Sequence, residues 1–313
     1  MSNETLEQIM NVGAAAGPFG TGDAVLEQTL RDFIQLQSTT IAIATDLVGV
    51  RTVPWMQFKW YTGTQGTFTY PIDDNAVVDP TKIGTENYSV VLNKGQGRCI
   101  FLDSVRLRGE SWENLDRQQM AIIRARADVI DNNVLAALYN GAGQSAAATA
   151  TFGAATADEE SDLLTAMDSI FANARVSGDE GLALVLPADK RSAMLNTQLY
   201  GNVVESLSDH MGRVASLRIY YTRDYDGTGG SAYVATTSSA IGDDALLLIP
   251  GGATAEYLQY NGEGFMETEM TRIEGVGYSW LLTSFWGTIV HEHQDGASAG
   301  LNNRIYKLTG VRS

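Results

Sequence analysis

The stretch that decides the fold is ARADVIDNNVLAALYNG, residues 125–141, which has the pattern of a helix ending in a glycine-containing turn. The helix is expected to begin at Ser111, a good N-cap residue, with Glu113 favourably placed in its first turn. Neither proline nor glycine interrupts the chain from there to Gly141, which suits a left-handed residue after the helix end. The sequence therefore predicts one helix over residues 111–140, roughly 42 Å long at 1.5 Å per residue.

This helix has one apolar side. The stripe consists of large aliphatic residues at helical spacing, namely Leu115, Ile122, Ile123, Ile130, Val134 and Leu138. The charged residues lie mostly off the stripe, namely Arg117, Arg124, Arg126 and Asp128. A helix of this length exceeds the globular average and has no residue suited to chemistry on its apolar side. We expect it to lie as a spine across a sheet.

Residues 55–104 have the alternating pattern of β-strands. MQFKWYT and TFTYPI flank GTQG as one expected hairpin, and ENYSVVLNK and RCIFLDSVRL flank GQG as a second pair. DDNAVVDPTKIGT between the pairs reads as an exposed loop. About 50 residues are thus expected to form a long two-stranded excursion. Such a strand pair is only marginally stable by itself in water. It must pack on its own body or on a neighbouring subunit.

The flanking regions predict an arm before this excursion and an α/β unit after the long helix. Residues 1–54 contain a Gly/Ala-rich stretch and then an amphipathic helix capped by Asp23. After a linker of small residues, a capping-box pattern at Thr156–Glu159 starts a helix. Further elements are expected at LALVLP (strand), ADKRSAMLN (helix), and the strands SLRIYYT, SAYVATT, ALLLIP and AEYLQY, with two more strands within ETEMTRIEGVGYSWLLTSFWGTIVHEH.

The charge balance argues against nucleic-acid binding. The chain of 313 residues has 37 acidic and 21 basic residues, a formal net charge of -16. Such a surface repels DNA. Only five of the basic residues are lysine, and aspartate outnumbers glutamate, a composition that resembles halophilic proteins. An ordinary acidic protein is the alternative. No stretch has the roughly 20 apolar residues of a membrane span, and the first residues lack a signal-peptide pattern.

No catalytic, cofactor or metal site is predicted. His291 and His293 alternate in HEHQ without a third ligand, and the third histidine, His210, stands alone. Cys99 has no second cysteine for an internal disulfide and no hallmark of a nucleophile. The glycine-rich GDEGLALV and DGTGGS lack a P-loop lysine. The acidic residues 158–162 could bind a cation, but they fit better as a solvated helix start.

The order of these elements resembles a known family. An arm, a long hairpin, a helix ending ID..vLaaLy.G.G, the segments LALVLPADKRSAML and DDALLLIPGG, and a terminal pair ending SFWGTIVHEH together resemble a tailed-virus major capsid protein. That resemblance implies the α+β Hong Kong ninety-seven capsid fold. Its zones would be an N-terminal arm at 1–54, an E-loop hairpin at 55–104, a P-domain at 105–154 with its spine helix at 111–140, an A-domain at 155–255, and return strands to the P-domain with the C-terminus at 256–313.

The resemblance also implies partners. The partners would be many copies of the chain itself, arranged as hexamers and pentamers around double-stranded DNA, with a portal and a separate scaffold or decoration protein. A virion capsid, assembled in the host cytoplasm, would be its location. Some relatives are joined by isopeptide bonds from an E-loop lysine, and Lys82 lies in that zone, but no catalytic glutamate is identifiable. The alternatives are an encapsulin-like nanocompartment shell and an acidic hydrolase of unrecognised type.

Overall fold

The computed structural model describes residues 42–63, 85–102, 111–174, 180–200, 203–222, 241–260, 266–273, 277–291 and 301–312. Side chains are undescribed at some positions within these ranges, including the first turns of the long helix. The arm at 1–41, the loop at 64–84 with Lys82, the expected strand SAYVATT and His293 lie outside the described residues.

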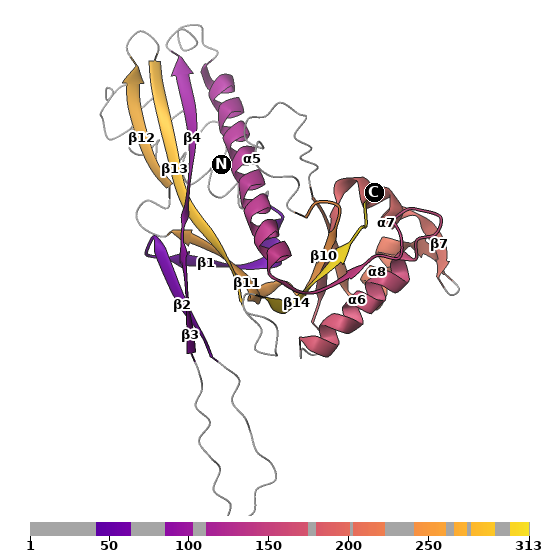
Figure 1. Cartoon of the computed structure of the whole chain (residues 1–313). Coiled ribbons are helices and arrows are strands. Elements are labelled where there is room, and N and C mark those ends of the chain that lie inside the picture. Colours follow the sequence, from indigo (N-terminus) through magenta and orange to yellow (C-terminus); the bar gives the residue numbers. More distant parts are fainter. Residues whose placement is uncertain are drawn as a thin grey trace, which may run out of the picture.

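A long sheet and a long helix form one part of the molecule (Figure 1). Among the described residues the sheet has the order β1-β11-β13-β12, and β4 also pairs with β13. Its strands are β1 (Val48–Val53), β4 (Asn93–Leu102), β11 (Gly251–Tyr260), β12 (Met266–Ile273) and β13 (Gly277–Val290). Helix α5 (Ser111–Asn140) runs beside β4 and β13, as predicted for the long helix. The short helix α3 (Ala44–Leu47) precedes β1.

A second five-stranded sheet forms the other part, which carries the remaining described helices (Figure 1). Its order is β5-β14-β10-β6-β9. The strands are β5 (Ala142–Ala147), β6 (Leu182–Pro187), β9 (Leu217–Thr222), β10 (Ala245–Leu248) and β14 (Asn302–Thr309). The helices are α6 (Glu159–Asn173), η1 (Ala188–Lys190), α7 (Arg191–Leu195) and α8 (Leu207–Ala215).

Two further strand pairs extend from these parts. β2 (Gln57–Gly63) pairs antiparallel with β3 (Thr85–Val91), and the pair projects from the first sheet (Figure 1). β7 (Thr197–Tyr200) pairs with β8 (Val203–Ser206) just before α8. The predicted two-stranded excursion is therefore present. Along its whole length β2 pairs with β3, and residues 67–72, which were expected to pair with 56–62, lie outside the described residues.

The strands β6 and β10 of the second sheet are buried on both faces, which explains their continuous apolar sequences. Leu246 and Leu248 of β10 pack in a cluster with α5 residues, whereas Leu247 lies in a cluster with α6 residues. All six residues of LALVLP in β6 are buried. The same alternation divides β6, with Val185 on the α5 side and Leu184 on the α6 side. This sheet is thus the layer that joins the two parts.

The predicted apolar side of α5 is confirmed. Ile123, Ile130, Val134 and Leu138 are fully buried, and Arg124 is exposed. The side chains of Leu115 and Arg117 are not described. The placement of Arg126 was wrong, because its side chain is only 8% exposed and lies under the helix. A long aliphatic stem lets an arginine pack there, which spacing alone does not reveal.

Three glycines were misread as turn residues. A Cβ at Gly95 would lie 2.0 Å from Cη2 of Trp286, and a Cβ at Gly97 would lie 3.2 Å from Cγ2 of Ile122. β4 therefore runs straight through the expected GQG turn, and its glycines permit close approach of neighbouring side chains. Gly141 is not left-handed either. A Cβ there would meet Val290 Cγ1 at 2.7 Å, so packing requires this glycine.

Other expectations also need correction. The expected linker after α5 contains β5, which pairs parallel with β14. The N-cap of α6 is Asp158, whose carboxylate accepts a hydrogen bond from Ser161 N, and the helix does not begin at Thr156. Leu164 of α6 is 37% exposed, although the pattern placed it on the apolar side. β1, β7, β8, α8 and β14 were not predicted.

Candidate functional site

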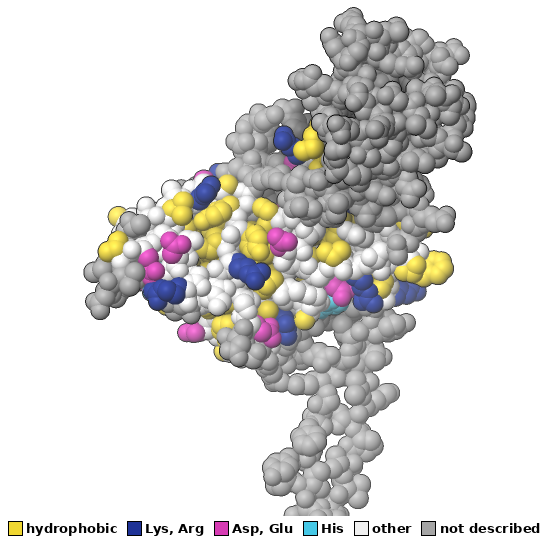
Figure 2. All heavy atoms as spheres, turned by 180° about the vertical axis from the view of Figure 1, so that it is seen from behind, with side chains coloured by type: hydrophobic (Ala, Val, Ile, Leu, Met, Phe, Trp, Pro, Cys, Tyr) yellow, Lys and Arg dark blue, Asp and Glu magenta, His cyan; other side chains and the backbone are white. Residues whose placement is uncertain are grey.

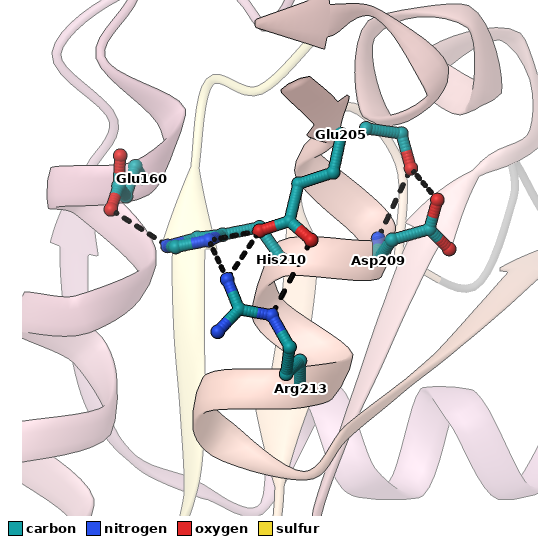
Figure 3. Close-up of polar contacts among 6 residues, drawn as sticks. Glu160, Glu205, Asp209, His210 and Arg213 are labelled. Atoms are coloured by element: carbon teal, nitrogen blue, oxygen red, sulfur yellow. Dashed lines mark hydrogen bonds and ion pairs between the residues drawn. The ribbon is translucent and has the colours of Figure 1, made fainter. Parts of the chain in front are cut away.

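The most connected polar cluster joins α6 to the β8–α8 segment (Figure 3). His210 lies between two carboxylates, with Nδ1 2.8 Å from Oε1 of Glu205 and Nε2 3.2 Å from Oε1 of Glu160. Arg213, one turn along α8, places its Nη2 2.5 Å from the same Glu205 oxygen. Hydrogen bonds from Arg213, and then from His210, lower the pKa of Glu205 below its ordinary value.

This cluster consists of charged side chains that pair with one another. The imidazole of His210 contacts the carboxylates of Glu160 and Glu205, and its Nδ1 lies 3.3 Å from Nη2 of Arg213. Its contacts connect α6 to the β8–α8 segment, which lies far along the sequence, and the Ser206 hydroxyl accepts a hydrogen bond from Asp209 N at the start of α8. The cluster is a structural brace. His210 had been identified in the sequence only as an isolated histidine, because the approach of Glu160 depends on tertiary packing.

The acidic residues at the start of α6 are also used structurally. Asp162 accepts hydrogen bonds from the backbone and hydroxyl of Thr149, at 2.9 and 2.6 Å. Glu159 accepts one from Gly153 N at 2.8 Å. Among the described residues no group of three or more His, Cys, Asp or Glu side chains is arranged to hold a metal ion. The carboxylates at 158–162 fit the interpretation as a helix start.

The remaining residues considered from the sequence are dispersed. His291 has its Nε2 3.7 Å from Oε1 of Glu256, whose other oxygen is 3.3 Å from Nη1 of Arg51. Cys99 lies on β4 opposite Trp280, and its side chain is not described. These positions do not meet in a common site.

The exposed apolar residues are a stronger functional signal. Four of them lie where β1 leads into the β2–β3 pair, and we call them the hairpin-base residues: Val50 (52% exposed), Trp55 (73%), Met56 (44%) and Val91 (65%). The β2–β3 base is fixed to the body on one side, where Phe58 and Val90 pack with Leu258 and Phe285. Large apolar groups that face water beside a projecting strand pair indicate a protein–protein contact.

The described surface carries charges of both signs. Figure 2 shows Lys and Arg side chains interspersed with Asp and Glu and with hydrophobic patches on the face opposite to that of Figure 1. The described part of this face has no continuous basic stripe.

Known proteins with similar structures now assign the fold. The capsid of cyanophage P-SCSP1u matches with a TM-score of 0.59 and 13% identity, over 87% of this chain and 89% of that chain. A virus-like particle from Pyrococcus furiosus matches with a TM-score of 0.58 and 9% identity, over 90% of this chain and 98% of that chain. This chain has the Hong Kong ninety-seven capsid fold. The capsid of Myoviridae phage XM1 agrees, with a TM-score of 0.58 and 12% identity over 86% of this chain and 91% of that chain.

The Hong Kong ninety-seven fold is found here by structure and not by sequence similarity. No protein-family model matches the sequence, and no curated protein matches it either. None of the helices in the described part combines the length and apolar character that crossing a membrane would need.

Proposed function

We propose that this chain is a major capsid protein that self-assembles into the icosahedral shell around the double-stranded DNA genome of a tailed virus. The observation that carries the proposal is that this chain matches capsid chains over 89–91% of their own length. The braced polar cluster and the dispersed histidines favour a structural role without enzyme activity.

Within this proposal, the zones take the roles that the resemblance implies. Residues 1–54 would be the N-terminal arm, although 48–53 belong to β1 of the long sheet. Residues 55–104 would be the E-loop, 105–154 the P-domain with α5 as its spine helix, and 155–255 the A-domain, which includes β6, β9 and β10 of the second sheet. Residues 256–313 would return to the P-domain and end the chain.

The E-loop zone would make the contact between subunits. The base of its β2–β3 pair packs on the body, and the hairpin-base residues are exposed. We expect this surface to pack on a neighbouring copy in hexamers and pentamers. Deletion of residues 73–84 should leave a folded, soluble subunit that no longer closes shells. Particles of normal size from the deletion variant would contradict this assignment.

An encapsulin-like shell around protein cargo is the alternative. The observation that favours it is the match over 98% of the chain of a virus-like particle. The same fold therefore also builds particles that are described as virus-like. The two proposals differ in what the particles would contain. Particles isolated from the natural source should contain nuclease-protected double-stranded DNA if the chain belongs to a virus, and a single enriched enzyme if it forms a compartment.

If the chain belongs to a virion, its further partners, its place of assembly and its host environment can also be proposed. A portal, and a separate scaffold or decoration protein, would be the partners beside the chain itself, and the subunits would assemble in the host cytoplasm. The acidic, lysine-poor composition suggests a virus of a hypersaline host, in which molar salt screens repulsion between subunits. An acidic inner wall would also leave the packaged DNA free to exit.

A further inference from the structure

The described elements cross between the two parts of the molecule at three places, and these places lie together where the parts meet (Figure 1). The first is the end of α5, where Gly141 leads into β5. The second is the short connection from β10 to β11, which contains Ile249. The third leads from β13 to β14, where His291 follows β13 and Asn302 begins β14.

The side chain of Asn302 connects these crossings. It is fully buried, and its amide nitrogen donates hydrogen bonds to the backbone carbonyls of His291 and of Thr254, the second at 3.1 Å. Its amide oxygen accepts a 2.8 Å hydrogen bond from the backbone nitrogen of Arg304 in β14. Its own backbone nitrogen donates to the carbonyl of Gly141 at 2.8 Å. One residue of the second sheet is therefore bonded to β11, to the end of β13 and to the end of α5.

The amide of Asn302 matches this set of partners. Two carbonyls need two donors and one N–H group needs an acceptor, and a single asparagine amide supplies all three. A carboxylate would instead turn an oxygen toward the carbonyls. An aliphatic side chain would leave buried backbone groups without hydrogen bonds, which destabilises a fold. The identity of residue 302 thus follows from its position between the two sheets.

A second buried residue, Thr254 of β11, ties the same place together. Thr254 is fully buried, and its hydroxyl donates a 2.6 Å hydrogen bond to the carbonyl of Ile249. The backbone nitrogen of Ile249 in turn donates to the carbonyl of Arg304 at 3.1 Å. β5 also lies very close to β14, because a Cβ on Gly143 would be only 2.6 Å from Oδ1 of Asn303. A change of the angle between the two sheets would break several of these buried hydrogen bonds at once.

We propose that Asn302 and Thr254, which we call the joint residues, hold the long sheet and the second sheet at one fixed angle in every subunit. The consequence for assembly rests on the proposed shell function. A closed shell of one size needs subunits of a defined shape, because closure depends on the angle at which each copy meets the next. The joint residues are positioning residues, and they determine whether particles have a single diameter.

A matched pair of threonine variants tests the joint residues. Thr254→Val removes the hydroxyl that bonds the carbonyl of Ile249 between the two parts. Thr222→Val is the control, because it removes a buried hydroxyl whose 3.4 Å hydrogen bond to the carbonyl of Leu186 lies within the second sheet. Asn302→Leu is the stronger change, since it keeps a side chain of similar shape and removes all three of its hydrogen bonds.

The distance between two spin labels on unassembled subunits measures the angle between the parts. One label is attached at Arg124→Cys of α5 and the other at Ala172→Cys of α6, both exposed positions, in a chain that also carries Cys99→Ser. Each joint variant should broaden the distance distribution, and the control should leave it as narrow as in the labelled parent. A folded joint variant with a distribution as narrow as that of the control would overturn the proposal. If Asn302→Leu fails to fold, the threonine comparison decides.

Electron microscopy of the assembled particles tests the consequence for the shell. The joint variants should give particles of several diameters or open sheets, and Thr222→Val should give the diameter of the unmodified chain. Joint variants that broaden the label distances and still close into particles of the normal single diameter would overturn the proposed link to the shell. Failure of the unmodified chain to form particles under any condition would instead refute the proposed function, and the label distances would still test the joint residues.

Discussion

Truncation of Ile130 measures how firmly α5 is held against the two sheets. Ile130 is fully buried in a cluster that includes Val134, Leu246 and Tyr257. Ile130→Ala removes three carbon atoms, worth about 0.8 kcal/mol each when buried. The cavity left behind adds to this, so we expect a loss of about 3 kcal/mol in the free energy of unfolding. Ile130→Asp adds the cost of a buried charge and should abolish folding of a domain of ordinary stability.

The assay is equilibrium unfolding of unassembled subunits in urea, with Arg124→Ala as the control on the same helix. Arg124 is exposed, so its truncation should change the free energy of unfolding by less than about 0.5 kcal/mol. Both variants have the same helical backbone and the same new residue, and alanine is at least as good a helix former as either residue. Equal losses for Ile130→Ala and Arg124→Ala would refute the assignment of the buried face.

Three further predictions follow from packing, titration and charge. Gly95→Ala should cost about 1–3 kcal/mol, measured by urea unfolding, because its Cβ would lie 2.0 Å from Trp286, whereas Gly97→Ala should be milder. The Tyr139 hydroxyl donates a 2.6 Å hydrogen bond to Asp244, which raises the pKa of Tyr139 to about 12. The neutral phenol therefore contributes stability below about pH 10 that is lost as pH rises through 12, and Tyr139→Phe should reduce that loss in alkaline melts. Assembly followed by light scattering should require salt, because the screening length falls from roughly 10 Å at 0.1 M to 3 Å at 1 M, and particles that stay intact in millimolar buffer without divalent cations would contradict this.

Elements with strong local patterns were predictable from the sequence. The helix over 111–140 has an uninterrupted stripe and clear ends, and it is found with these bounds. β6 and β10 are short apolar runs, and the structure explains them by burial on both faces. In these segments local preference and tertiary packing favour the same structure.

Elements defined by distant partners were not predictable. β5 has the composition of a linker and becomes a strand because β14, more than 150 residues later, supplies its hydrogen bonds. The glycines of β4 are typical of a turn, yet the sheet needs them because Trp286 and Ile122 lie against them. Glycine permits both a turn and a close approach, so only the neighbouring side chains distinguish the two.

The candidate functional sites also include features that the sequence could predict and features that it could not. The projecting strand pair could be inferred from its lack of a core of its own. The brace around His210 could not, because Glu160 and Glu205 approach it from separate elements. Arg126 was misplaced for a related reason, since it lines a cavity that forms only when α5 lies on β4.

Electron microscopy of the purified full-length chain, across a range of salt concentrations, tests the central claim most directly. The account predicts closed icosahedral particles built of hexamers and pentamers, with the β2–β3 pair of each subunit lying on a neighbour. Folded subunits that remain monomeric at every salt concentration and subunit concentration would contradict it.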